Sequence, residues 1–446
     1  MSELRKKINE QFVSNVFETD SEFSEWFGYY NYDVISCDGN RMLCNRAKFD
    51  GRAITVQDNI ELGWYDLDTG NWNEIGNTNS FNWQQGAMLQ WIPETENKVV
   101  YNCAIGDKFK SVIYDVKTKQ KKIIDFPVYC LTPDGKYSIS LNYERSYWCR
   151  AYHYQNIINK KYNVRVAEDD GVFCVDLENG NVTRIIDIND VIKFDFEEVF
   201  NKSKHWLEHI MISPDGSKIT FLHRFSFGDG YKTRICISDI NGENLQVIPG
   251  YHNKEWSHFG WKGDKEFCIY TVDNGEFAVK YTEKVMQNNA LKVKESSNKN
   301  IKDKCKDFIK EILPQVVKDR IIGRKKYYQH YVENESGLFT LQDIYDGYLL
   351  NIDGHPSFTK DGKYMITDSY PDERGYQRLI IYNTINKKGI IIGKFYAAFK
   401  GNPASCDLHP KLCFNDNYIV VDTAYSGKHR MNVLKINWDR VKNKLN

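Results

Sequence analysis

Short apolar strands alternate with tight polar turns along the whole chain, and one strand–turn–strand pattern recurs. Its clearest copies have turns of the Asp-Gly type, at residues 36–39 (SCDG), 132–135 (TPDG) and 213–216 (SPDG). Weaker copies lie at 261–264, 359–362 and 414–417. Because Asp and Gly suit the backbone of a tight turn and the following strands are apolar, each copy predicts an antiparallel hairpin.

A third and a fourth strand follow each hairpin, and four short antiparallel strands per unit are typical of a β-propeller blade. A further hairpin with a longer turn lies near residue 93. The central hairpins then fall at about residues 36, 93, 134, 215, 263, 361 and 416. The length of 446 residues would also allow two or three ordinary domains. The repeat instead predicts one all-β domain over residues 1–446, a seven-bladed β-propeller.

Three segments depart from the repeat. Residues 1–27 begin with a charged, amphipathic stretch, and we expect them to form a helical or closing segment. Two insertions are expected, at 150–208, with a helical stretch around 190–206, and at 288–325, with apolar residues at helical spacing. The second insertion is rich in lysine, which indicates a solvated face or, alternatively, a surface that binds polyanions.

Composition narrows the class of protein. The 60 basic and 60 acidic residues balance, so no global field attracts nucleic acid or an anionic membrane. The 11 cysteines form no CxxC pairs, which argues against a disulfide scaffold and fits a reducing compartment. Without an apolar export signal or a run of about 18 apolar residues, the sequence predicts a soluble cytoplasmic protein.

Four of the ten histidines share one position in the repeat. His209, His258, His355 and His409 lie four, three, four and five residues before the turns of their units. Innermost strands line the channel of a propeller, so these imidazoles are expected to meet at one end of it. Such a cluster suits a divalent metal, Zn²⁺ or Mn²⁺, and Cys406 is a candidate for a thiolate ligand. The alternative is that each histidine only bonds a neighbouring carbonyl.

A second set of residues is expected near the same rim. His223 and Arg224 end one strand, and Tyr143 and Arg145 end the corresponding strand of the preceding unit; the alternative for all four is ordinary solvation. Residues 82–91 are dense in amides and aromatic rings, which suits sugar hydroxyls and stacking, although such residues also pack blades together. The candidate substrate-binding residues there are Gln84, Gln85 and Gln90.

The chain resembles the seven-bladed propellers of the oligogalacturonate lyase and ulvan lyase type. The resemblance is carried by segments that span most of the chain, at 28–33 (GYYNYD), 82–91, 209–224 (HIMISPDGSKITFLHR), 257–261, 353–372 and 406–436. It implies β-elimination at a uronic acid, in which a cation neutralises the carboxylate and a His or Tyr removes the adjacent proton.

The resemblance also implies roles for single residues. His258 and His355 correspond to metal ligands, together with His409 and, as an option, Cys406. His209 is either the base or a fourth ligand. His223 and Tyr143 are further candidates for acid or base, and Arg145 and Arg224 for binding the carboxylate.

One departure favours the first of the two lyase types. Ulvan-type enzymes carry catalytic histidines in an early blade, whereas residues 82–107 contain none, and Met88 and Asn102 cannot transfer protons. We therefore expect a metal-dependent lyase that acts on uronic-acid oligosaccharides. The alternatives are a non-catalytic glycan-binding or assembly propeller with a structural metal and, on fold analogy alone, a protein-interaction scaffold.

Overall fold

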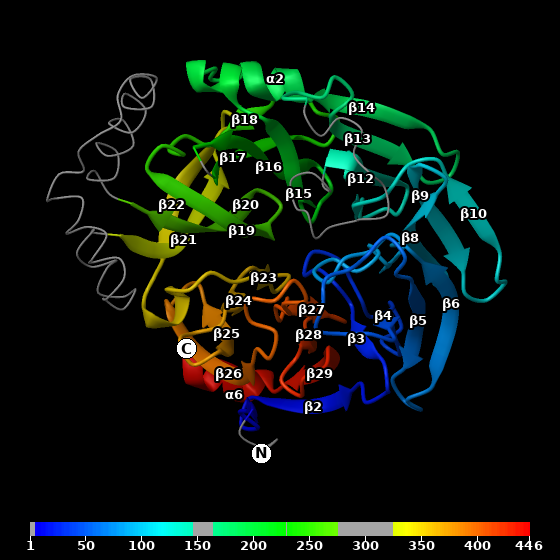
Figure 1. Ribbon diagram of the computed structural model, residues 1–446. Helices are drawn as coiled ribbons and strands as arrows, with labels where there is room; N and C mark the ends of the chain where they lie inside the picture. Colours follow the sequence, from blue (N-terminus) through cyan, green and yellow to red (C-terminus); the bar gives the residue numbers. More distant parts are fainter. Residues whose placement is uncertain (1–4, 146–163, 229, 275–323) are drawn as a thin grey trace, which may run out of the picture.

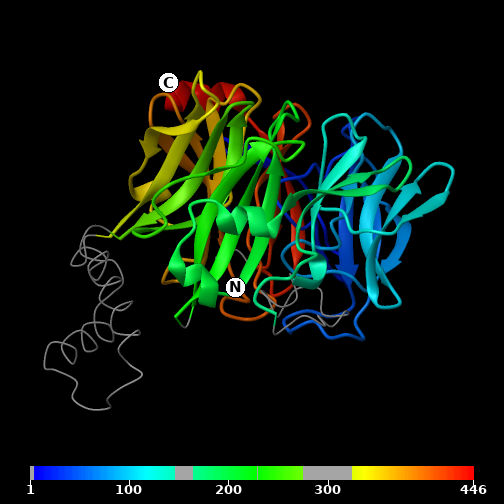
Figure 2. The same cartoon turned by 90° about the horizontal axis from the view of Figure 1, so that it is seen from above.

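Seven antiparallel sheets stand around a central axis in the computed structural model, which describes residues 5–145, 164–228, 230–274 and 324–446. Figure 1 views the molecule along this axis, and Figure 2 views it from above, after a turn of 90°. All seven predicted hairpins open or lie within a separate sheet, so the predicted seven-bladed β-propeller is confirmed.

In each of the first three blades the strands follow one another in chain order from the innermost to the outermost. Blade 1 contains β3 (Ser24–Trp26), β4 (Arg41–Ala47), β5 (Ile60–Asp66) and β6 (Trp72–Thr78). Blade 2 contains β7 (Gln90–Trp91), β8 (Lys98–Ile105), β9 (Lys108–Asp115) and β10 (Lys121–Ile124). Blade 3 contains β11 (Cys130–Leu131), β12 (Tyr137–Leu141), β13 (Gly171–Asp176) and β14 (Val182–Asp187).

The remaining blades have the same order. Blade 4 contains β15 (His205–Ile212), β16 (Lys218–Phe227), β17 (Gly230–Asp239) and β18 (Gln246–Val247). Blade 5 contains β19 (Lys254–Gly263), β20 (Glu266–Asp273), β21 (Lys325–Glu333) and β22 (Phe339–Tyr345). Blade 6 contains β23 (Ser357–Phe358), β24 (Tyr364–Asp368), β25 (Tyr376–Asn383) and β26 (Lys388–Tyr396), and blade 7 contains β27 (Lys411–Cys413), β28 (Tyr418–Thr423) and β29 (Arg430–Ile436).

The N-terminal segment closes the ring. β2 (Val13–Glu18) is the outermost strand of blade 7, where Val13 pairs with Ile436, and β1 (Lys6–Ile8) extends blade 6. Of the two alternatives expected for this segment, the described residues 5–27 form strands that close the ring and contain no helix. Pairing with an open sheet edge satisfies the backbone polar groups that a helix would otherwise satisfy internally. The C-terminal helix α6 (Trp438–Leu445) buries Val441 and Leu445 in a cluster that also contains Phe12 and Val13.

The Asp-Gly turns follow one local design. In the third blade, the Thr132 hydroxyl donates to Asp134 Oδ1 at 2.6 Å, and the Lys136 amide donates to the same oxygen. Gly135 has φ +68°, and a Cβ there would lie 2.1 Å from the Pro93 carbonyl oxygen of the preceding blade. Glycine is therefore required both by the turn and by the close approach of two blades.

The first predicted insertion is smaller than expected. β13 and β14 lie inside the range 150–208, and they are regular strands of blade 3. The additional elements are α2 (Ile188–Lys193) and the 3-10 helix Glu198–Lys202, which confirm the helical stretch in part. A second 3-10 helix, Tyr348–Leu350, precedes blade 6. The Lys-rich segment lies almost wholly outside the described residues.

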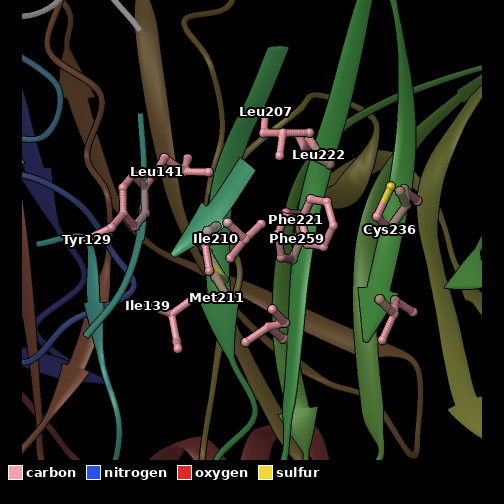
Figure 3. Close-up of a cluster of buried hydrophobic side chains, with 14 of the residues drawn as sticks. Tyr129, Ile139, Leu141, Leu207, Ile210, Met211, Phe221, Leu222, Cys236 and Phe259 are labelled. Carbon is pink, nitrogen blue, oxygen red and sulfur yellow. The ribbon is translucent and has the colours of Figure 1, made fainter. Parts of the chain in front are cut away.

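Hydrophobic side chains fill the spaces between blades. The cluster in Figure 3 joins three of them, with Ile139 from blade 3, Phe221 from blade 4 and Phe259 from blade 5, all fully buried. Burial of one such side chain contributes about 1.5–3 kcal/mol. The blades thus form a stiff ring that holds the ends of the innermost strands in place. Within the described part of the chain, no helix has the length and apolarity to cross a membrane.

Candidate metal centre and adjoining cavity

The four predicted histidines lie where the innermost strands of blades 4 to 7 are irregular or begin. β15 has a bulge between Glu208 and Met211, and β19 has one between Trp256 and Phe259, so that His209 and His258 leave the regular ladder. His355 and His409 each precede their strand, β23 or β27, by two residues. A bulge redirects a side chain out of the alternating pattern, and here it brings imidazoles toward the axis.

The histidines form one contiguous cluster. The ring centroids of His258 and His355 are 4.1 Å apart, those of His355 and His409 are 4.3 Å apart, and those of His209 and His258 are 5.8 Å apart. The predicted convergence at one end of the channel is therefore present. The Asp-Gly turns follow the innermost strands and lie at the opposite end.

Two tyrosines of blade 1 enter the same cluster. The innermost strand of this blade is interrupted, because β3 pairs with the end of β4 and Ile35 bridges to Met42 near its start. The intervening segment carries Tyr29, whose ring lies 4.9 Å from that of His409, and Tyr30, whose ring lies 5.1 Å from that of His355. The backbone of this interruption is thus placed directly against the histidines.

Asp422 of blade 7 holds the interruption in place. Its buried carboxylate accepts hydrogen bonds from the backbone amides of Phe27 and Gly28, at 3.0 and 3.1 Å. Gly28 has φ +120°, and a Cβ there would lie 2.3 Å from the Tyr32 hydroxyl, so a side chain does not fit. Burial raises the pKa of Asp422 well above its ordinary value, and the two amides oppose this rise.

Each histidine has a hydrogen-bond partner at Nδ1. His355 Nδ1 lies 3.0 Å from Asp368 Oδ1, and His258 Nδ1 lies 3.2 Å from Asp353 Oδ2. His409 Nδ1 donates to the Gly28 carbonyl at 2.6 Å, and His209 Nδ1 lies 2.7 Å from the Tyr29 hydroxyl. Such partners fix the ring orientation of metal-binding histidines and raise their basicity.

The opposite nitrogens of two rings are buried and lack a hydrogen-bond partner among the described residues. These atoms are His355 Nε2 and His409 Nε2. An unpaired buried polar atom costs about 1–3 kcal/mol, so such atoms indicate a partner that protein groups do not supply. One ring nitrogen each of His355 and His409 and a carboxylate oxygen of Asp407 lie within 4.8 Å of one another. These donors fit a divalent cation such as Mn²⁺ or Zn²⁺.

Burial shifts the pKa values of the candidate ligands His409 and Asp407 in opposite directions. It lowers the pKa of His409 well below the ordinary value, and the neighbouring His355 and His258 lower it further. It raises the pKa of Asp407 to about 6, although His355 acts in the opposite direction. His409 is therefore neutral near pH 7, which is the form that binds metals.

A cavity of about 410 Å³ adjoins the cluster. The predicted residues His209, His258, His355, Arg224, Gln84 and Gln85 line it, together with Tyr29, Glu208, Asp353, Tyr370 and Asp407. The Arg224 guanidinium donates to Glu208 Oε2 at 2.5 Å and lies 4.8 Å from the centre of the Tyr231 ring. Glu208 Oε2 also lies 3.6 Å from His209 Nε2. The cavity thus joins metal-type donors, an oriented cation and amide groups.

Three predicted residues do not reach this rim, and their expected position there is wrong. The Tyr143 hydroxyl is buried and donates to the Val128 carbonyl at 2.8 Å. Arg145 is buried and donates to the carbonyl of His205 at 2.9 Å. His223 lies on the opposite face of β16 from Arg224, because successive strand residues alternate, and there it bonds His205.

Two other predicted residues are displaced for related reasons. Cys406 is buried outside the cavity lining, its thiol pKa is raised well above the ordinary value by burial, and its neighbour Asp407 faces the cavity instead. Gln90 is also buried, and its amide donates to the carbonyls of Met88 and Tyr129. We find it in the packing between blades 2 and 3 and not in the cavity.

The carboxylates and Tyr29 were not among the site residues predicted from the sequence. A signal was present, because Asp353 and Asp407 each precede a cluster histidine by two residues. Asp353 contacts His258, and Asp407 lies next to His355, so each carboxylate reaches the histidine of the preceding blade. Asp368 is the buried last residue of β24 and Tyr29 lies in another blade, and no local spacing links either one to the histidines.

Comparisons with known proteins support the fold. One similar solved structure is described as an oligogalacturonate lyase in complex with manganese; it has a TM-score of 0.62 and 14% identity, covering 96% of this chain and 94% of that chain. Another is an oligogalacturonate lyase from Vibrio parahaemolyticus, with a TM-score of 0.55 and 13% identity, covering 95% and 93% of the two chains. No protein-family model and no curated protein sequence matched. At such identities the likeness shows the seven-bladed fold alone.

Proposed function

We propose that this protein is a metal-dependent lyase that cleaves uronic-acid oligosaccharides by β-elimination. The observation that carries the proposal is the histidine cluster. Hydrogen bonds hold its four Nδ1 atoms, while the buried Nε2 atoms of His355 and His409 have no hydrogen-bond partner among the described residues, and the adjoining cavity is lined by the Arg224 guanidinium. Two similar solved structures are described as oligogalacturonate lyases, one of them in complex with manganese. We infer that this chain also uses Mn²⁺ or Zn²⁺.

His258, His355, His409 and Asp407 are the proposed metal ligands. When bound there, the metal supplies a positive charge that stabilises the uronate carboxylate as the adjacent carbon loses its proton. Asp368 and Asp353 keep the His355 and His258 rings in orientation through their Nδ1 atoms. The ligand set is therefore prepared before the substrate enters.

Arg224 is the proposed second cation for the substrate carboxylate. Its bond to Glu208 and its position over Tyr231 orient the guanidinium at the cavity wall. A fixed cation at the place where negative charge develops lowers the barrier more than a mobile one, since no reorganisation is needed. Gln84 and Gln85 supply amides for the sugar hydroxyls.

His209 is the proposed base. In the tautomer with the proton on Nδ1, this atom donates to the Tyr29 hydroxyl and Nε2 carries the lone pair that accepts the proton of the sugar carbon. The resulting imidazolium is stabilised by the Glu208 carboxylate 3.6 Å from Nε2. The electron pair of the broken C–H bond forms the new C=C double bond, and the glycosidic oxygen leaves with a proton from solvent.

The direct test measures product formation. Purified protein with Mn²⁺ or Zn²⁺ is incubated with galacturonate, glucuronate and mannuronate oligomers, and the ultraviolet absorbance of the 4,5-unsaturated product is followed. We expect activity that is lost on chelation and in His209→Gln, with His252→Gln, a change of a half-exposed histidine outside the cavity, as the control. If the metal-bound protein produces no increase in absorbance with any of these oligomers, the proposal is refuted.

The second candidate is a glycan-binding or assembly propeller with a structural metal. It is favoured by the positions of Tyr143, Arg145 and His223, which remove three of the expected catalytic groups from the cavity. The variant His258→Ala separates the two. If the metal is catalytic, the variant folds but loses the turnover of wild type. If the metal is structural, wild type has no turnover and the variant has a lower melting temperature.

A further inference from the structure

A second cavity extends the first one outward between blades 4 and 5. Its volume is about 650 Å³, and it shares five residues with the first cavity: Arg224, Tyr231, Ser257, Asp353 and Tyr370. Both therefore lie on the same end of the propeller as the histidine cluster. A ligand longer than one sugar ring can pass from one into the other.

Cations outnumber carboxylates in the lining of this groove. Among the residues that the structure describes, its charged side chains are Arg224, Lys232, Lys254, Arg324, Lys326, Glu255 and Asp353. This surplus contrasts with the whole chain, in which 60 basic residues balance 60 acidic ones. The local excess of positive charge attracts anions to a protein that has no global field of its own.

The two carboxylates are already engaged. Glu255 accepts from Arg324 at 2.8 Å, and Asp353 contacts His258 in the cluster. Three lysines from three strands line the groove: Lys232 of β17, Lys254 of β19 and Lys326 of β21. Burial lowers the pKa of Lys232, and a bound anion would offset this cost.

Aromatic surface accompanies the charges. Tyr231 is 51% exposed at the boundary of the two cavities, and the Arg224 guanidinium lies over its ring. Tyrosine offers an apolar face together with a hydroxyl, which suits the C–H face and the hydroxyls of a sugar ring. A row of cations with an aromatic ring at the junction matches a chain of sugars with repeated negative charges.

We propose that the groove between blades 4 and 5 binds the successive anionic groups of an acidic oligosaccharide whose reacting residue lies at the histidine cluster. The inference rests on the proposed function and specifies its substrate as an oligouronide longer than a disaccharide. Carboxylates and sulfate esters share this chemistry of recognition, and the experiment distinguishes them.

The test compares binding of short and long probes by isothermal titration calorimetry. We use digalacturonate, tetragalacturonate, a heparin-derived tetrasaccharide and neutral maltotetraose with wild type and with the double variant Lys254→Gln/Lys326→Gln. The expected result is a loss of about tenfold in affinity for the tetramer, about threefold per lysine, with less than a twofold change for the dimer. Tighter binding of the heparin fragment would assign the groove to sulfated chains, and maltotetraose should not bind.

A matched control removes two lysines from the other end of the propeller. Lys136 and Lys363 lie in Asp-Gly turns, and each contacts the Asp of its own turn through an exposed pair. Lys136→Gln/Lys363→Gln should leave binding of all probes unchanged. An equal loss in both double variants would indicate general electrostatics and would overturn the proposal.

The outcomes separate this inference from the proposed function. If the protein cleaves oligouronides but Lys254→Gln/Lys326→Gln binds the tetramer as tightly as wild type, the lyase proposal stands and the groove proposal is refuted. If the double variant loses affinity for the tetramer but wild type shows no turnover, the lyase proposal is refuted. The groove proposal then holds for a glycan-binding protein. Failure of wild type to bind either charged tetrasaccharide rejects the groove directly.

Discussion

Acid should destabilise this protein through a buried pair of histidines on β15 and β16 of blade 4. His205 and His223 are both fully buried, and His205 Nδ1 lies 2.9 Å from His223 Nε2. Arg234 donates to His223 Nδ1, and His205 Nε2 bonds the Phe200 carbonyl. These contacts assign a single chain of hydrogen bonds from Arg234 through His223 and His205 to Phe200, in which both imidazoles are neutral.

Protonation of either ring breaks this chain, since a second N–H then faces a donor. Burial lowers the pKa of His205 from 6.5 to about 4, although the bond to Phe200 opposes this effect, and burial lowers that of His223 well below its ordinary value. The unfolded chain thus binds more protons than the folded one between these values. The stabilising contribution is complete above pH 6.5 and is lost as the pH falls toward 4. For His205 alone the loss is about 3 kcal/mol, at about 1.4 kcal/mol per pKa unit.

The assay is urea denaturation at pH values from 7 to 4 in the presence of a chelator, so that metal binding does not contribute. His205→Gln removes the titrating group, and the free energy of unfolding should then depend less on pH by about 3 kcal/mol over this range. His252→Gln, which changes a half-exposed histidine paired with Glu197, should alter the dependence by less than about 1 kcal/mol. An unchanged dependence in His205→Gln would refute the reasoning.

Three further predictions concern the turns, the metal and the cluster. Gly135→Ala should cost more than the about 1–2 kcal/mol of left-handed backbone strain, because its Cβ meets the Pro93 carbonyl, whereas Gly70→Ala, with φ +74° and open space, should cost the strain alone. Urea midpoints compare the two variants, and equal losses would contradict the close approach. Asp368→Asn should weaken Mn²⁺ affinity about 10- to 100-fold in calorimetry with the fold retained, and an unchanged affinity would show that His355 needs no carboxylate partner. Tyr29→Phe should shift the pH profile of kcat/KM, because His209 Nδ1 loses its partner, and a profile that stays in place would exclude that bond from the reaction.

The repeated strands and turns could be predicted from the sequence because they depend on local interactions. Alternation of apolar residues sets the strands, and turn chemistry such as Thr132–Asp134 sets their boundaries. Counting from those turns located His209, His258, His355 and His409 correctly, since a repeat places equivalent positions on one axis.

The side chains that face the cavity and the positions of the strand bulges could not be predicted in the same way. A change of one residue along β16 moves a side chain to the other face, and this alone separates Arg224 in the cavity from His223 in the core. Asp407 and Cys406 precede β27 in an irregular segment, where no strand alternation predicts which of the two faces the cavity. The strand bulges that turn His209 and His258 inward depend on pairing with distant strands.

By itself, the sequence determined the number of blades, the ring of histidines and the lack of a global charge, because these follow from short-range pattern and composition. Only the tertiary structure decided which carboxylates hold those histidines, that Tyr29 of blade 1 joins them, and that lysines from three strands share one groove. Those relations join residues up to several hundred positions apart. They exist because closing the ring brings the innermost strands of all blades around one axis.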